Sequence, residues 1–224
     1  MKICIISDTH TKHKCLNFEL KSIEADVIIH CGDMTGNGGI KAIEEFMTWF
    51  SNLDQFKHKI CVAGNHDWLF ERDNLRAREV VPENVIYLED EETVIDGIKF
   101  YGTPVQKHFC NWAFNRSEAK MAQHWAAIPD DTDVVITHSP PYGVGDYVSN
   151  GYSTEVNQGS PSLYMEIVKR IKPKIHAMGH IHEGYGVKVI DDITFINASN
   201  LDAQYQCVNP PILIEIINGI VNVI

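Results

Sequence analysis

Five short, largely apolar runs, each closely followed by polar or glycine residues, constrain the fold of this chain more than any other feature of its sequence. The runs are residues 3–6, 27–29, 60–63, 134–136 and 175–177. Runs of this length with polar or glycine boundaries are typical of buried parallel strands. Because parallel strands have their carboxyl ends at the same edge of a sheet, the side chains that follow these runs are expected to gather at one edge, where open α/β sheets bind ligands.

The polar residues after these runs are of the types that bind divalent metal ions. They occur in Asp8-Thr9-His10, in Gly32-Asp33, in Gly64-Asn65-His66-Asp67, at His138, and in Gly179-His180-Ile181-His182. On an extended segment, residues two apart can point the same way. This applies to Asp8 and His10 and to His180 and His182. A carboxylate together with an imidazole suits a first-row divalent ion. Each motif alone is weak, because an Asp-Thr pair also caps turns, but together they indicate one metal site.

The order of expected elements predicts an α/β fold. Strands are expected at 2–7, 26–31 and 59–63, with helices at 40–55 and 68–78. A hairpin over 93–101 turns at Asp96-Gly97, a pair suited to a tight turn, and is followed by a helix at 117–127, a strand at 133–137, a helix at 161–172 and a strand-rich final third. We predict a four-layer α-β-β-α sandwich in a single domain over 1–224, with two mixed β-sheets packed face to face and helices outside.

The charge and hydropathy of the chain exclude several function classes. The formal net charge is −11 at pH 7, and without a basic run the chain is not expected to bind long nucleic acid. The apolar stretches fall far short of the ~20 residues that a membrane span needs, and the run after Met1 is too short for a signal peptide. We therefore expect a cytoplasmic protein without a membrane partner, and the sequence leaves a homodimer open.

The six cysteines of the chain show no paired spacing. Three of them, Cys4, Cys31 and Cys61, fall in or beside expected buried strands, where a thiol behaves as a small hydrophobic group. A disulfide framework is typical of short secreted chains. We therefore expect all six cysteines to be reduced and structural.

The set D-x-H, G-D, G-N-H-D, H and G-H-x-H resembles the calcineurin-like metallophosphoesterase superfamily, over nearly the whole chain from Asp8 to His182. Further stretches resemble its class III cyclic-nucleotide phosphodiesterase-like branch, the metallophosphoesterase-domain-containing proteins. These stretches are 29–35, 102–104, 112–115, 137–141, 179–186, 196–199 and 209–211.

The resemblance implies a binuclear metal centre, with manganese as the expected metal and iron, zinc, nickel, cobalt or magnesium as alternatives. One ion would take Asp8, His10, Asp33 and His182, and the other Asp33, Asn65, His138 and His180, so that Asp33 bridges both together with a hydroxide. Asn65 and His66 would also contact the substrate. His66 would be the catalytic residue that protonates the leaving oxygen, a task that suits an imidazole.

One departure from the family pattern concerns the orientation of His66. Many relatives carry G-D-x-x-D, in which the second Asp orients the catalytic histidine, whereas this chain has Gly36 at that position. The neighbouring Asp67 is one candidate for the missing orienting group. A second expectation concerns Trp112, whose loop resembles the family's pocket rim, so that this indole either binds substrate or simply packs the loop onto the body.

The function that these inferences favour is hydrolysis of a small phosphodiester, such as a cyclic nucleotide, by a metal-bridging hydroxide. A phosphomonoesterase or a nuclease on the same fold is the first alternative, although a nuclease would be expected to carry a basic groove. A scaffold protein without catalysis is the second alternative. Such relatives typically lose the histidine of G-N-H or a metal ligand, whereas this chain keeps His66 and all seven expected ligands.

Overall fold

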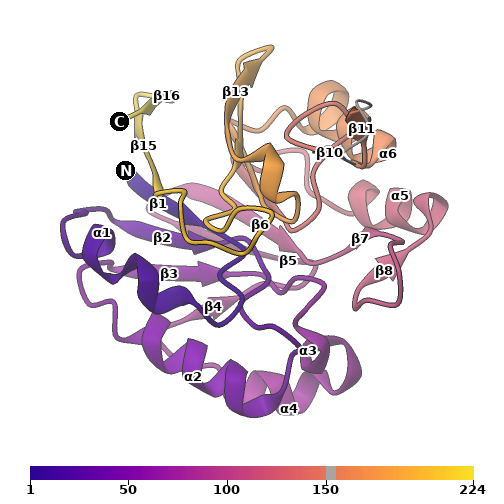
Figure 1. The fold of residues 1–224 in the computed structure, drawn as a ribbon. Helices are drawn as coiled ribbons and strands as arrows, with labels where there is room; N and C mark the ends of the chain where they lie inside the picture. The colour runs from indigo at the N-terminus through magenta and orange to yellow at the C-terminus, as the bar shows by residue number, and fades with distance from the viewer. Residues whose placement is uncertain (150–154) are drawn as a thin grey trace.

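The computed structural model describes residues 1–149 and 155–224, and these residues form two six-stranded sheets (Figure 1). The first sheet has the order β16 (Ile220–Val223), β15 (Ile212–Ile217), β1 (Lys2–Ile6), β2 (Val27–His30), β3 (His58–Cys61) and β4 (Ile86–Tyr87). The second has the order β13 (Gly186–Ile190), β14 (Ile193–Asn197), β12 (Ile175–Met178), β9 (Val134–Thr137), β6 (Ile98–Thr103) and β5 (Glu91–Ile95). Both sheets are mixed, because β1 to β4 and the β6-β9-β12-β14 ladder are parallel while the hairpin strands are antiparallel.

Helices cover the outer face of each sheet. On the first sheet lie η1 (His13–Leu16), α1 (Asn17–Lys21), α2 (Ile40–Ser51), α3 (Trp68–Arg72) and α4 (Asn74–Glu79). On the second lie α5 (Glu118–Ala126), α6 (Pro161–Met165) and its continuation η2 (Glu166–Ile171). In Figure 1, α2 to α4 lie at the bottom and α5 and α6 at the upper right, with the two sheets between them. In the described part of the chain, no helix combines the length and the hydrophobicity that a membrane crossing requires.

The alternation of side chains along the strands builds the layers. In β1, Ile3 and Ile5 face the second sheet, where they join a cluster that contains Val134 and Ile136. The intervening Cys4 packs toward the helices on the outer face. Since successive strand residues point to opposite faces, each central strand buries both of its faces. The predicted four-layer α/β sandwich with two mixed sheets is confirmed.

Several boundaries differ from those predicted from the sequence. The expected hairpin forms, with positive φ at Asp96 (48°) and Gly97 (80°), as a tight turn of this kind requires. The expected helix at 68–78 is divided into α3 and α4 at Asp73, whose side chain accepts a hydrogen bond from the Arg76 N–H of the second helix. The expected helix at 161–172 is α-helical only to Met165 and then widens into the π-helix η2.

A disulfide between Cys15 and Cys207 overturns one expectation from the sequence. The two cysteines are 192 residues apart and both are exposed. Cys4, Cys31, Cys61 and Cys110 are free thiols, so the expectation of reduced cysteines is wrong only for this pair. The bond joins η1 to the segment that follows β14, and only the folded chain brings these two positions together.

Removing the disulfide should weaken the fold. We expect Cys15→Ser to lower the free energy of unfolding by about 2–4 kcal/mol, because a cross-link over a long loop restricts the unfolded chain. Urea denaturation without reductant measures this difference. The control is Cys110→Ser, a free exposed thiol, for which a change within about 0.5 kcal/mol is expected. A Cys15→Ser variant as stable as the parent protein would contradict a formed disulfide.

Candidate metal centre

Loops from both sheets meet at the carboxyl ends of β1, β2, β3, β9 and β12. Backbone hydrogen bonds join the first two of these loops, from Asp8 N to Gly32 O (3.0 Å) and from His10 N to Asp33 O (3.0 Å). The two sheets are joined at the same edge by a bridge between Ser7 and Ser199. The polar residues that follow the five apolar runs are therefore gathered at one place.

Four of the predicted ligands have a left-handed backbone. The φ angles are 53° at Asp8, 39° at His10, 56° at Asp33 and 69° at His180. A non-glycine residue in this region costs about 1–3 kcal/mol and persists where the surrounding structure enforces it, often at functional sites. Four residues with left-handed backbone at one edge of the sheets therefore indicate a functional site, independently of which side chains they carry.

Three groups of side chains bring possible metal-binding atoms close together. They are Asp8, His10 and His182; His10, Asp33 and His66; and Asp33, His138 and His180. Within each group, the potential ligand atoms all lie within 4.8 Å of one another. Asp33 Oδ2 lies 3.6 Å from His10 Nε2 and 3.4 Å from His138 Nε2. Asn65 extends the third group, since its Oδ1 lies 3.0 Å from His138 Nε2. The structure thus brings all seven predicted ligands together, with Asp33 between two groups.

Hydrogen bonds behind the site aim the imidazoles toward its centre. His138 Nδ1 donates to the Cys31 carbonyl (2.9 Å) and His182 Nδ1 donates to the Asp202 carbonyl (2.9 Å), so both rings offer Nε2 to the site. Metal-binding histidines usually donate their other ring nitrogen in this way. Asp8 accepts hydrogen bonds from the backbone N–H of His180 (2.9 Å) and from Ser199 Oγ (3.0 Å).

The electrostatics of the site suit a cation. Asp8 is 0% exposed and Asp33 is 2% exposed. Burial favours the neutral acid, but the neighbouring histidines, His138 above all, hold the pKa of Asp33 well below its usual range. Burial alone would lower the pKa of His138, yet the carboxylates of Asp33 and Asp8 outweigh it and raise the pKa to about 9. Two buried carboxylates surrounded by imidazole nitrogens and an amide oxygen form a donor set that fits first-row divalent ions.

His66 lies beside this centre and is oriented by a backbone carbonyl. Its Nδ1 donates to the Gly36 carbonyl at 2.8 Å, and its Nε2 lies 4.0 Å from Asp33 Oδ2. One face of the imidazole is stacked on Trp112, with ring centroids 4.0 Å apart and an interplanar angle of 30°. The ring of His10 packs edge-to-face with it, with ring centroids 4.6 Å apart. Many relatives have an Asp at position 36, and its side chain orients the histidine. In this chain the backbone carbonyl of Gly36 contacts the imidazole instead.

The hypothesis that Asp67 orients His66 is wrong. The carboxylate of Asp67 accepts hydrogen bonds from the backbone N–H groups of Met34, Thr35 and Gly64 and from the Thr35 hydroxyl, at 2.8–3.2 Å. It therefore ties the loop after β2 to the loop after β3. Burial and the nearby charge of Asp33 raise the pKa of Asp67 to about 6.

The C-terminal segment supplies supporting residues that were not predicted from the sequence. Ser199 and Asp202 support Asp8 and His182, and the ring of Tyr205 packs against the rings of His10 (4.9 Å) and His182 (5.2 Å). The stretch 196–199 carried a family resemblance but no assigned role. For Tyr205 the sequence held no signal, because its contacts depend on the path of the chain after β14.

The comparisons with known proteins agree with this geometry. A family model described as calcineurin-like phosphoesterase matches residues 1–184. The chain belongs to this family. It is 34% identical over 238 residues to metallophosphoesterase domain-containing protein 1 of Homo sapiens, covering 96% of this chain and 70% of that protein. It is 33% identical over 232 residues to UPF0046 protein K07C11.7 of Caenorhabditis elegans, covering 96% and 75%.

Solved structures of low sequence identity share the fold. The structure of TT1561 of Thermus thermophilus has a TM-score of 0.64 at 16% identity and covers 88% of each chain. A structure described as a novel archaeal phosphodiesterase has a TM-score of 0.50 at 18% identity and covers 100% of this chain and 99% of its own. At this identity the likeness supports the sandwich architecture alone.

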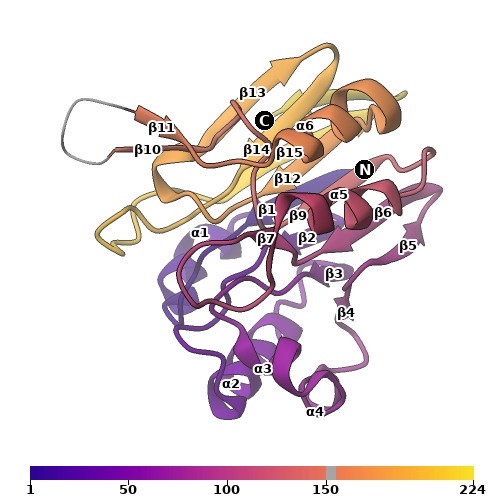
Figure 2. The same ribbon diagram turned by 90° about the vertical axis from the view of Figure 1, so that its right-hand side faces the viewer.

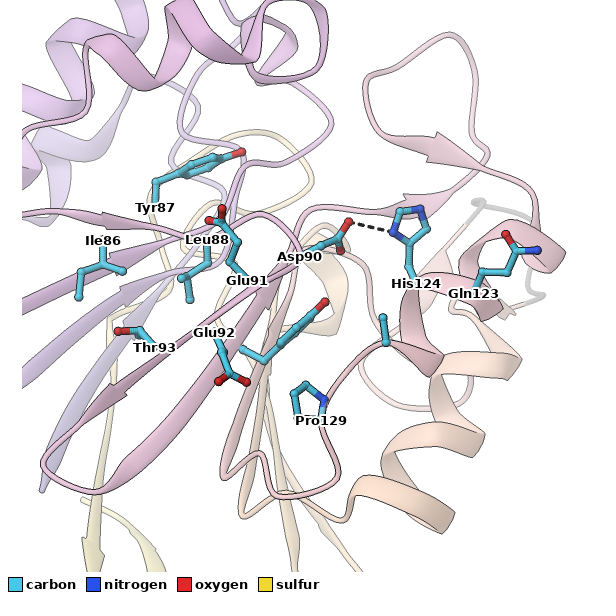
Figure 3. A pocket seen from close by; sticks show the side chains of 12 residues that line it. Ile86, Tyr87, Leu88, Asp90, Glu91, Glu92, Thr93, Gln123, His124 and Pro129 are labelled. Carbon is cyan, nitrogen blue, oxygen red and sulfur yellow. Dashed lines mark hydrogen bonds and ion pairs between the residues drawn. The ribbon is translucent and has the colours of Figure 1, made fainter.

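Two cavities differ in their relation to the centre. One of about 480 Å³ is lined by His180 and His182 together with residues of three other segments. The other, of about 900 Å³, lies between β4, β5, β6 and α5 and includes Asp90, whose carboxylate is 2.9 Å from His124 Nδ1 (Figure 3). None of the residues that line this larger cavity belongs to the three groups of possible metal ligands. Of these two cavities, the smaller one therefore borders the centre.

Substitution of Asp33 should cost more metal than substitution of a ligand at the side of the site. We expect Asp33→Asn to lose both ions, because Asp33 lies between two groups, and His182→Ala to lose mainly one. Mass spectrometry of the purified proteins measures the number of metal ions per chain. The control is Asp54→Asn, which changes an exposed carboxylate. Equal losses of a single ion in both variants would contradict a bridging Asp33.

Proposed function

We propose that this member of the calcineurin-like phosphoesterase family hydrolyses small phosphodiesters, such as cyclic nucleotides, with two divalent metal ions. The observation that carries the proposal is the position of Asp33 between two groups of metal-binding atoms, with His66 Nε2 4.0 Å from its carboxylate. Manganese is our choice of metal, since carboxylate and imidazole donors suit first-row divalent ions. Iron, zinc, nickel, cobalt and magnesium are the alternatives.

The residues divide the work of hydrolysis among themselves. Asp8, His10, Asp33 and His182 would hold one ion, and Asp33, Asn65, His138 and His180 the other. When bound, a pair of such ions supplies an activated water and a positive clamp for the phosphate oxygens. With both ions bound, the four histidines and Asn65 would contribute neutral donor atoms and only Asp8 and Asp33 would contribute negative charge, so the site would keep net positive charge for an anionic ester despite the net charge of −11 on the chain.

His66 is the acid for the leaving oxygen in this proposal. Because its Nδ1–H is engaged by the Gly36 carbonyl, any proton that it transfers must come from Nε2, the nitrogen on the side of Asp33. The stack on Trp112 limits rotation of the imidazole about its own axis. His66 is thereby held ready for general acid catalysis before substrate arrives.

The preference for a diester rests on the surroundings of the phosphate. A diester has two ester oxygens, which carry two organic groups in an acyclic diester and one nucleoside in a cyclic nucleotide, and the site offers two different environments beside the phosphate. His66 and Trp112 lie at one of these environments, and the 480 Å³ cavity beside His180 and His182 offers the other. A monoester has one ester oxygen and would leave one of the two environments without a substrate group.

A direct comparison of two chromogenic substrates tests the proposal. With manganese added, we expect bis-(p-nitrophenyl) phosphate to be hydrolysed with a higher kcat/KM than p-nitrophenyl phosphate. Chelation should abolish both activities, because in the proposed scheme only the bound metal ions activate the attacking water. Faster monoester hydrolysis would favour the phosphomonoesterase alternative. Hydrolysis of neither substrate by metal-loaded protein would favour the scaffold alternative, and selective cleavage of oligonucleotides would favour the nuclease.

Removal of the His66 imidazole should slow hydrolysis according to the leaving group. We expect His66→Ala to keep its metals and to lose about 10²–10⁴-fold in kcat on an alkyl ester, the usual range for general acid catalysis. The loss should be much smaller for a nitrophenol leaving group, which needs no proton. Steady-state kinetics on a matched alkyl and nitrophenyl series measures the difference. Equal losses across the series would contradict the acid role.

Substitution of Trp112 separates a positioning role from a substrate-binding role. Because the indole stacks on His66, we expect Trp112→Ala to lower kcat on alkyl esters while KM changes little, and Trp112→Phe to restore part of the rate. The kcat and KM values of both variants on a nucleotide diester decide this. A raised KM with unchanged kcat would instead support the prediction that Trp112 binds the substrate.

A further inference from the structure

A cavity distinct from the candidate metal centre lies where the chain passes from β4 of the first sheet to β5 of the second. It measures about 900 Å³ and is lined by residues of β4, β5, β6 and α5 and by residues close to these elements. Figure 2 faces this side of the molecule, with β6 and β5 to the right of α5 and β4 below them. The volume lies within the range of small-molecule sites, and the proposed hydrolysis uses none of the residues that line the cavity.

Carboxylates supply most of the charge in this cavity. Asp90, Glu91 and Glu92 belong to its wall, and Figure 3 shows their side chains pointing in different directions around it. Among the described residues of the wall there is no lysine and no arginine. A cationic ligand therefore meets an excess of negative charge here, whereas an anionic ligand is repelled.

Each of these carboxylates has one basic neighbour at the surface. The pairs are Asp90 with His124 Nδ1 (2.9 Å), Glu91 with Arg78 Nη2 (3.1 Å) and Glu92 with Lys99 Nζ (3.7 Å). Lys99 lies closer to Asp131, at 2.8 Å, so its charge is shared between two carboxylates. Exposed pairs of this kind are weak, and a carboxylate has lone pairs for more than one donor. The three carboxylates can therefore accept further hydrogen bonds from a cation.

The hydroxyl of Tyr101 is an unpaired polar group in the same wall. Tyr101 is only 4% exposed, yet its hydroxyl forms no hydrogen bond with any described residue. By contrast, the hydroxyl of Tyr87, also in the wall, donates to Glu89 Oε2 at 2.6 Å. The Tyr101 oxygen is not one of the fully enclosed unpaired atoms of the described chain, so it is accessible from the cavity. Because buried polar groups are nearly always hydrogen-bonded, this hydroxyl points to a ligand that completes its bonding.

The position of Tyr101 in the sheet brings its side chain to the carboxylates. Tyr101 is directly opposite Glu92 in the pairing of β5 with β6, and the side chains of opposite residues lie on the same face of a sheet. Burial and the charges of Asp90, Glu91 and Glu92 raise the pKa of Tyr101. A protonated hydroxyl and these carboxylates can therefore contact one ligand.

The spacing of the carboxylates favours an extended cation over a metal ion. In the described part of the chain, three or more possible metal-binding side chains have their ligand atoms within 4.8 Å of one another only at the candidate metal centre. Asp90, Glu91 and Glu92 do not form such a group, so they do not surround a single ion. A ligand with positive charges spaced along a chain can reach more than one of them.

Apolar surface accompanies the charged groups. Ile86 and Pro129 are half-buried members of the wall, and Ala127 is an exposed one. The methylenes of a long cationic side chain commonly lie along such surface while its charged end stays hydrated. A free aliphatic polyamine combines the same kind of methylene chain with ammonium groups at intervals.

We propose that this cavity binds an aliphatic polyamine. Its ammonium groups pair with Asp90 and Glu92, one of them donates a hydrogen bond to the Tyr101 hydroxyl, and its methylenes lie along Ile86 and Pro129. The inference is independent of the proposed function, because none of these residues holds a metal ion or contacts the ester in that scheme.

Calorimetric titration of manganese-loaded protein with spermidine and with 1,8-octanediol tests the proposal. The two compounds have chains of equal length, but the diol is neutral. A salt concentration of about 0.15 M screens the long-range attraction between a polyamine and a chain of net charge −11. We expect spermidine to bind at least about tenfold more tightly than the diol, because hydrogen bonds between charged groups are the stronger ones.

Variants of the wall assign the binding to this cavity. Tyr101→Phe removes the hydroxyl and keeps the ring, and it should weaken spermidine binding about three- to tenfold, the effect of one hydrogen bond. The double variant Asp90→Asn/Glu92→Gln removes two charges and should weaken binding roughly tenfold. Asparagine tolerates the left-handed backbone at position 90, where φ is 54°. Thermal melts without spermidine check that both variants fold.

The matched control is the double variant Glu45→Gln/Asp54→Asn. It also removes two exposed carboxylates, one of them paired with Lys14 at 2.7 Å, but neither lines the cavity. Because distant charges are screened at this salt concentration, we expect spermidine affinity to change by less than about twofold.

Each result supports or overturns the polyamine site. Preference for spermidine over the diol, lost in the two cavity variants and kept in the control, supports it. Equal losses in the cavity and control double variants would show attraction by net charge alone and overturn it. Unchanged affinity in a folded Tyr101→Phe protein, or equal binding of the diol, would also overturn it. None of these readings depends on whether an ester is hydrolysed.

Discussion

The burial of Asp8 and Asp33 at the edge where the two sheets meet is the constraint on which the rest of the site depends. Removing an ionised carboxylate from water costs roughly several kcal/mol, so it must be compensated by charge and hydrogen bonds. Asp8 receives the backbone N–H of His180, and Asp33 receives the backbone N–H of His66 at 2.8 Å. These bonds join the loop after β1 to the loop after β12, and the loop after β2 to the loop after β3. The carboxylates therefore organise the loops as well as the centre, and the left-handed backbone at four predicted ligands is the cost of that arrangement.

The residues of the site could be predicted from the sequence because they follow strands whose pattern is local. Runs such as 3–6 and 134–136 indicate buried strands, and parallel strands have their ends at a common edge. The supporting residues could not be predicted in this way. Ser199 contacts Asp8 across a sequence separation of 191 residues, and the Asp202 carbonyl contacts His182 only because of the turn that follows β14. Contacts of this kind are a property of the completed fold and leave no periodic signal.

The segment from Asn200 to Asn209 contributes to the candidate metal centre, to the cavity beside it and to the disulfide. Its Asp202 supports His182, its Tyr205 lines the cavity, and its Cys207 is bonded to Cys15. Disulfides persist mainly in oxidising compartments, and the cytoplasmic location expected from the sequence stays a prediction. Hydrogen bonds also hold this segment, from Lys12 Nζ to the Tyr205 carbonyl and from the N–H groups of Gln204 and Gln206 to the Asp202 carboxylate.

The orientation of His66 shows how a backbone group can take the place of a missing motif side chain. The family pattern places a carboxylate at the position of Gly36, and its absence made Asp67 the candidate for the same role. The structure uses the Gly36 carbonyl, which accepts from His66 Nδ1 at 2.8 Å, while Asp67 ties two loops together. A carbonyl can fix the tautomer and direction of the ring as a carboxylate can, but its hydrogen bond is weaker because it is neutral, and its position depends on the course of the backbone. That course is set by Asp67, whose hydrogen bonds to Met34 and Thr35 hold the loop that leads to Gly36. Asp67 therefore supports the loop that carries the Gly36 carbonyl, whereas the hydrogen bond that orients the imidazole comes from that carbonyl itself.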